Sequence, residues 1–156
     1  MTENEISVWW LETPAAPRRV GIATYVPGTR ATSFVYDPAW IANGLALSGD
    51  MPLGPRPIIT ARGELPGAFS DAMPDRWGKR AIDATDAPRR TEDFDYLYYA
   101  GDSRFGVLGF SRGRERYMPH GPGVRPRIDS LERMQELVER INQRMPLTEE
   151  QKLLMN

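Results

Sequence analysis

The sequence predicts an α+β fold: a small, mainly antiparallel sheet with helices packed on one side and a C-terminal helical segment. Short β-branched and aromatic runs dominate the first 36 residues, whereas helical periodicity begins only after residue 64. The first runs are joined by short connections, which favour antiparallel neighbours. With 156 residues and 40% hydrophobic content, the chain is long enough to bury one core.

Three apolar runs predict the first strands, at residues 6–11, 20–26 and 32–36. Asp37 then predicts a helix cap, because the proline that follows it suits the first position of a helix. The next stretch is rich in proline and glycine, so we expect irregular structure with one brief strand at 58–60.

Helical spacing starts with Leu65, Phe69 and Met73, which recur every four residues. Pro74 interrupts this stripe, because proline lacks the N–H that a continuing helix needs. Asp75 can cap a second helix directly beyond the break, over residues 75–82.

A further helix is expected to start at Thr91 as its cap and to end at Gly101. A last strand is expected over residues 106–111. The sequence from 112 to 127 holds five arginines, three glycines and three prolines without periodicity, which is typical of a linker. Such a basic linker either contacts an acidic partner or is simply solvated.

Two helices are predicted in the last part of the chain. Asp129 with Glu132 has the spacing of a capping box, and an apolar stripe follows at positions 131, 134, 137, 138 and 141. Thr148 with Gln151 opens the second helix in the same way. The sequence thus divides into a subdomain at 1–111, the basic linker at 112–127 and a helical segment at 128–156.

Composition narrows the function classes. The net charge of −1 argues against a dedicated nucleic-acid binder, whose affinity depends on a positive surplus. The absence of cysteine excludes disulfides and thiolate metal sites and fits a cytoplasmic location. We also expect no membrane helix and no secretory signal, because the apolar runs are short and the start lacks a basic segment leading into an apolar one.

No catalytic, cofactor-binding or metal-binding residue is predicted. His120 is the single histidine and lies in the linker, where we expect a solvated side chain. Asp71, Asp75 and Asp83 leave open an alternative, a small carboxylate-based hydrolase using Asp71 and Asp75. The glycines at 101 and 106 follow a helix and precede a strand, the wrong polarity for a phosphate-binding loop.

Residues of the restarted helix are the candidates for contact with a partner protein: Trp77, Arg76, Asp75 and Arg80. Two interpretations of Trp77 are open. In the first, it is a core residue one turn beyond Met73. In the second, Pro74 breaks the helical phase and Trp77 projects from the surface as an anchor, a role in which tryptophan is over-represented.

Four segments, in order, resemble the opening of HipA-family serine/threonine kinase toxins. They are Val20–Ile22 leading to Ser33–Ile41, Ala46–Ser48 followed by Met51–Leu53, Leu65–Gly78, and Tyr99–Leu108. In that family the residues that hold ATP and magnesium lie downstream, on a Gly-rich loop and a later metal-binding segment, and neither has a counterpart here. The stretch from Pro146 to Gln151 resembles the family's approach to that loop, so the helical segment is expected to lead toward a missing kinase core.

The resemblance implies a non-enzymatic N-terminal region that regulates a toxin–antitoxin kinase through protein contacts. The expected partners are the kinase core of the same or another protein, a HipB-type DNA-binding antitoxin and a second copy of the chain (a homodimer), with no direct nucleic-acid or membrane contact. ATP and magnesium are expected only on the kinase core. A variant of this interpretation is a separately encoded antitoxin that docks on a kinase and restrains it.

Overall fold

A five-stranded antiparallel sheet forms the body of the molecule, with strand order β4-β3-β2-β1-β5. The computed structural model describes residues 3–102, 106–121 and 131–155. The strands are β1 (Glu5–Trp10), β2 (Arg18–Val26), β3 (Ala31–Tyr36), β4 (Ile58–Ile59) and β5 (Leu108–Ser111). The helices are α1 (Pro38–Asn43), α2 (Gly67–Asp71), α3 (Arg76–Thr85), α4 (Asp93–Tyr99), α5 (Leu131–Asn142) and α6 (Glu149–Met155). The predicted α+β class is confirmed.

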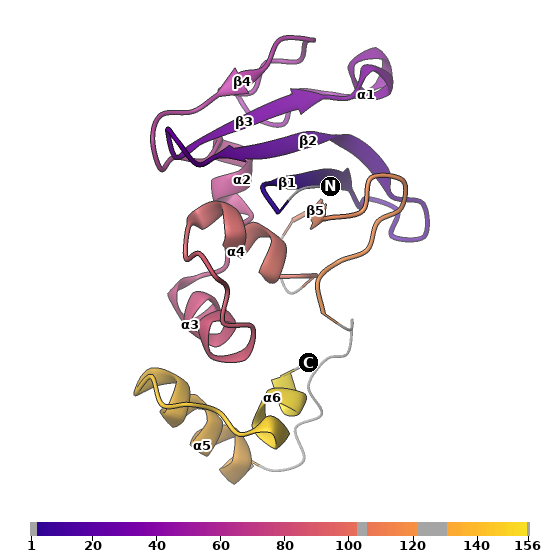
Figure 1. Cartoon of the computed structure of the whole chain (residues 1–156). Helices are drawn as coiled ribbons and strands as arrows, with labels where there is room; N and C mark the ends of the chain where they lie inside the picture. Colours follow the sequence, from indigo (N-terminus) through magenta and orange to yellow (C-terminus); the bar gives the residue numbers. More distant parts are fainter. Residues whose placement is uncertain (1–2, 103–105, 122–130, 156) are drawn as a thin grey trace.

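Helices α2 and α4 cover one face of the sheet, and α3, α5 and α6 extend away from it (Figure 1). Phe69 of α2 is fully buried and lies edge-on to two sheet residues, Phe34 of β3 and Phe110 of β5, with ring centroids 5.2 and 5.4 Å away. Such edge-to-face pairs add to the free energy gained by burial. Phe69 therefore holds α2 against the face of the sheet, where β2 and β1 lie between β3 and β5.

The centre of the sheet requires a glycine at position 21. A Cβ atom there would lie 2.2 Å from the Val35 carbonyl oxygen and 2.8 Å from the Phe34 ring. Both distances are far below van der Waals contact, and the nearer atom belongs to the backbone. Gly21 thus lets β2 pair with β3 while Phe34 lies against it.

The start of α1 is predicted correctly, but the role of Asp37 is not. Its carboxylate makes no capping hydrogen bond and instead pairs with Arg19 of β2, at 2.5 Å from the Arg19 Nε. A guanidinium offers the carboxylate a charged partner, which is a stronger attraction than the neutral N–H of a helix start.

The predicted cap at Thr91 is wrong by one residue. Helix α4 follows Glu92, whose carbonyl oxygen accepts the first hydrogen bond, 2.9 Å from the Asp95 nitrogen. Ion pairs hold this turn, since Glu92 lies 2.7 Å from Arg30 and Asp95 lies 2.9 Å from Arg90. Arg30 is distant in sequence from Glu92, and Arg90 is not at a capping spacing from Asp95, so capping rules alone did not predict the first residue of α4.

Helix α5 packs on α3 through a small second core made of Ala81, Leu137, Ile141 and Leu147. Thr148 and Gln151 form the predicted capping box of α6: each backbone N–H donates to the other side chain, at 3.0 and 3.2 Å. A second box was predicted at Asp129 and Glu132, and its first member, Asp129, lies outside the described residues.

Replacing Phe69 by alanine tests the closure of the main core. We expect Phe69→Ala to lower the free energy of unfolding by about 3–5 kcal/mol, because the cavity opens between two buried rings. Val35→Ala is the matched control: Val35 is 39% exposed, so its loss should cost about 1 kcal/mol or less. Urea unfolding measures both, and equal losses would contradict the packing described.

Candidate interaction surface

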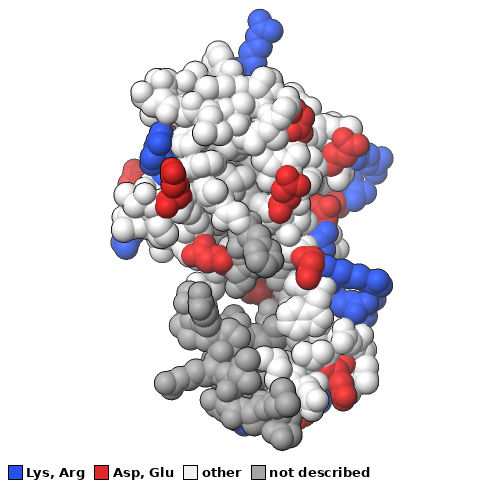
Figure 2. All heavy atoms as spheres, turned by 180° about the vertical axis from the view of Figure 1, so that it is seen from behind, with Lys and Arg blue, Asp and Glu red and all other residues white. Residues whose placement is uncertain are grey.

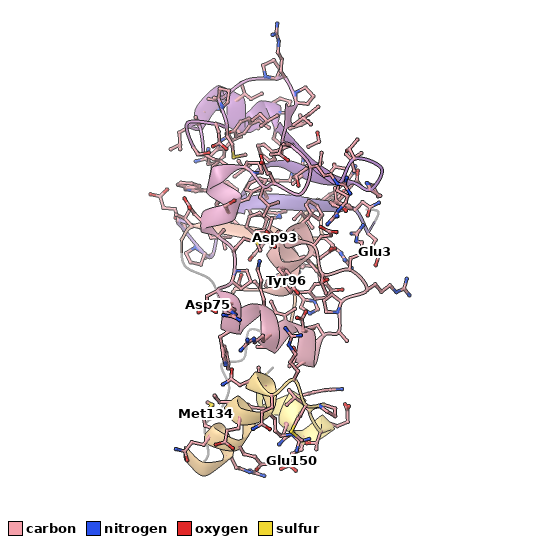
Figure 3. All side chains as sticks on the ribbon, turned by 90° about the vertical axis from the view of Figure 1, so that its left-hand side faces the viewer. Glu3, Asp75, Asp93, Tyr96, Met134 and Glu150 are labelled. Carbon is pink, nitrogen blue, oxygen red and sulfur yellow. The ribbon has the colours of Figure 1, made fainter. Side chains whose placement is uncertain are left out.

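The four predicted contact residues gather at the first two turns of α3, in the chain order Asp75, Arg76, Trp77 and Arg80. Asp75 caps the helix as predicted: its Oδ1 accepts a hydrogen bond from the Gly78 nitrogen at 2.7 Å. Figure 3 shows Asp75 at this end of α3. The side chains of Arg76 and Trp77 are exposed next to it, so a rigid helix start presents a cation and an indole together.

Trp77 is 39% exposed, and the interpretation of it as a core residue is therefore wrong. Helix α2 ends at Asp71 and Pro74 lies in the break before α3, so Trp77 does not continue the stripe of Phe69 and Met73. By helical spacing Trp77 instead shares a face with Ala81 and Ala84, which pack on α5. The indole thus lies one turn beyond the buried part of that contact.

Arg80 and Lys79 have partners within the chain. The Arg80 Nη1 donates to the Asn142 side-chain oxygen of α5 at 3.2 Å. Lys79 pairs with Asp93 of α4 at 2.7 Å and lies over the Tyr96 ring. These contacts hold α3 between α4 and α5, so the exposed start of α3 is fixed from both sides. Arg80 stabilises the position of this surface through its contact with α5.

The three candidate carboxylates have different surroundings. Asp71 is exposed at the end of α2, Asp75 caps α3, and Asp83 accepts a hydrogen bond from the Tyr96 hydroxyl at 2.7 Å. A groove of about 550 Å³ in the described part of the chain lies elsewhere, beside α1. None of the three carboxylates lines that groove.

His120 is held by protein contacts and is not the solvated side chain that we expected. Its Nε2 lies 2.5 Å from the Asp86 Oδ1 at the end of α3, and its ring lies 4.8 Å from both the Tyr98 and the Tyr99 ring. Arg112 stacks over Tyr98 at 4.2 Å. Arg112 and His120 thus lie against α4 and the end of α3, and the distant partners explain why the sequence pattern did not reveal these contacts.

Two buried groups beneath this surface have shifted pKa values. Burial raises the pKa of Asp95, although the ion pair with Arg90 opposes the shift. Burial, and then the hydrogen bond to Asp83, raise the pKa of Tyr96 well above its usual value. Tyr96 therefore stays neutral over the physiological range and links α4 to α3 as a hydrogen-bond donor.

The described residues contain neither a metal-binding cluster nor a membrane-spanning helix. Within residues 3–102, 106–121 and 131–155, no three histidine or acidic side chains are placed to hold a metal ion together. In the same ranges no helix has the length and apolar character needed to cross a bilayer.

Strands β2 to β5, helices α1 to α4 and the resembling segments all fall between residues 18 and 111, and a family model matches that region. The model describes the HipA N-terminal domain and matches residues 11–111. The chain belongs to the HipA N-terminal domain family. The match runs from the end of β1 through β5 and includes α3, so the candidate surface is part of the HipA N-terminal domain, whereas α5 and α6 follow it.

A comparison with curated proteins finds no match to this chain. The family membership therefore rests on the match to the HipA N-terminal domain model, together with the order of segments in the sequence.

The link between Tyr96 and Asp83 predicts a pH dependence of stability. Because the folded pKa of Tyr96 is raised, its contribution is fully present below the unfolded value near 10 and is lost as the pH rises beyond it. Tyr96→Phe should cost about 1 kcal/mol at neutral pH, and the difference from the wild type should shrink above about pH 10. Urea unfolding between about pH 7 and about pH 11 measures this; a constant difference would contradict it.

Proposed function

We propose that this chain is the N-terminal interaction and regulatory region of a HipA-type toxin–antitoxin serine/threonine kinase, without catalytic activity of its own. Its task is to dock on the kinase core through the start of α3. The observation that carries this proposal is the exposure of Trp77, which is 39% accessible on a helix fixed by its neighbours. A preorganised aromatic residue gives up little conformational entropy on binding.

The chemistry of the surface supports docking. Trp77 offers a large apolar area, Arg76 a planar cation beside it, and the α3 cap keeps both in place. Tryptophan and arginine are the residue types enriched at the energetic centres of interfaces.

The sequence supports the proposed lack of activity. Phosphoryl transfer needs a loop and side chains that neutralise the phosphates and hold magnesium. The glycine-containing connection that begins at Gly101 leads from α4 toward β5, so no helix start faces a bound phosphate there. ATP and magnesium are accordingly assigned to the kinase core, and a HipB-type antitoxin and a second copy of the chain are further proposed partners.

Trp77→Ala tests this proposal in a mixture with a HipA-family kinase core. Binding should weaken by about 2 kcal/mol or more, which is roughly a thirtyfold rise in Kd. Folding should be affected far less than the ~3–5 kcal/mol typical of a fully buried tryptophan. Calorimetry of the complex and urea unfolding of the free chain measure the two effects.

Ile59→Ala is the matched control, because Ile59 is an exposed apolar residue on the edge strand β4, at 69% accessibility. It should leave the Kd unchanged. Unchanged binding of Trp77→Ala would contradict docking at this surface. Kinase activity is also measured with and without the added chain. Lower activity in its presence would indicate that the chain restrains the kinase core, and unchanged activity would indicate docking alone.

A further inference from the structure

A groove of about 550 Å³ lies at the end of the sheet opposite the β2–β3 turn. It is formed where β1, β2, the start of α1 and the segment after β5 meet. The residues that line it are Trp9, Arg18, Arg19, Asp37, Ala39, Trp40, Arg114 and Glu115. None of them belongs to the α3 surface, so the groove needs a separate explanation.

Arg19 joins the walls of the groove, because each of its three side-chain nitrogens donates a hydrogen bond to them. Its Nε and Nη2 donate to the two carboxylate oxygens of Asp37, at 2.5 and 3.3 Å. Its Nη1 donates to the backbone carbonyl of Arg114 at 2.6 Å. One guanidinium thus ties the segment after β5 to β2 and to α1, which fixes the walls of the groove.

Two other guanidinium groups remain available on the rim. The Arg18 guanidinium lies 4.8 Å over the Trp40 ring, and among the described residues no carboxylate pairs with it. The Arg114 side chain is half exposed and spends one N–H on Glu5, at 3.1 Å. Stacking on an aromatic face orients a guanidinium without using its donors, so both groups can still bind an anion.

The charge of the groove selects the kind of anion. Arg19 neutralises Asp37, and Glu5 pairs with one N–H of Arg114. Arg18 is therefore the rim cation without a carboxylate partner among the described residues, and Arg114 has donors that Glu5 does not use, beside the exposed carboxylate of Glu115. Carboxylates fit a guanidinium in a bidentate geometry. A nucleic-acid backbone would need many more cations than two, and on the face seen in Figure 2 acidic and basic side chains are intermingled without a broad basic surface.

We propose that this groove binds an acidic peptide segment of a partner protein, whose carboxylates pair with Arg18 and Arg114. The basic residues that begin the segment after β5 then have a specific task, because Arg114 forms one side of the binding site. This inference does not depend on docking at Trp77, since the two surfaces share no residue.

Hexaglutamate peptide is the probe, and NMR of the indole N–H groups gives both affinity and location, since the chain has four tryptophans. The signals of Trp9 and Trp40 should shift while that of Trp77 stays in place. Arg18→Gln with Arg114→Gln should weaken binding at least about tenfold. Arg62→Gln, an exposed arginine beside the β2–β3 turn, is the matched control and should bind as the wild type does.

Four results would overturn the proposal. They are the absence of hexaglutamate binding at millimolar concentration, equal affinity of the double variant and the wild type, a shift confined to Trp77, and tighter binding of a single-stranded oligonucleotide that depends on the same two arginines. The result of the kinase-core binding test with Trp77→Ala does not affect the interpretation of these outcomes, because the groove is tested with a different ligand and through the indoles of Trp9 and Trp40.

Discussion

The break between α2 and α3 is the constraint on which the rest of the arrangement depends. Phe69 holds α2 against the sheet, and a continuing helix would carry Trp77 along the same covered face. Helix α2 ends at Asp71, and Pro74, which has no N–H to donate to a helical carbonyl, prevents it from continuing into α3. Asp75 then starts a new helix by accepting the Gly78 N–H. The main core is therefore covered by α2 and α4, and α3 does not pack on the sheet.

Instead, α3 packs against α5, α4 and the segment that contains His120. One side of α3 receives α5 through Ala81, another meets α4 through the hydrogen bond from Tyr96 to Asp83, and its end receives His120 through Asp86. The exposed first turn is thus the end of a helix that is held along its length. Rigidity of this kind lowers the entropy lost when a partner binds, which is why the position of Trp77 matters more than its exposure alone.

Local rules were sufficient where the decisive partners are close in sequence. The strands of the sheet, the start of α1, the Asp75 cap and the pair formed by Thr148 and Gln151 were all predicted from such neighbours. The same rules failed for Asp37 and His120, whose partners are 18 and 34 residues away. The groove beside Trp40 combines four segments that are separated in sequence, so no periodicity or motif could have revealed it. The sequence placed the contact candidates on one helix, but the exposure of Trp77 followed only from tertiary structure.

Docking at the start of α3 is tested most directly by hydrogen exchange of the chain alone and in complex with a HipA-family kinase core. Amides of residues 76–80 should gain protection in the complex, together with the neighbouring end of α5 near Asn142, because Arg80 joins the two helices there. The edge strand β4, on the far side of the sheet, should exchange at the same rate in both states. Protection confined to β4 and the neighbouring strand β3, with α3 unchanged, would contradict docking at the start of α3.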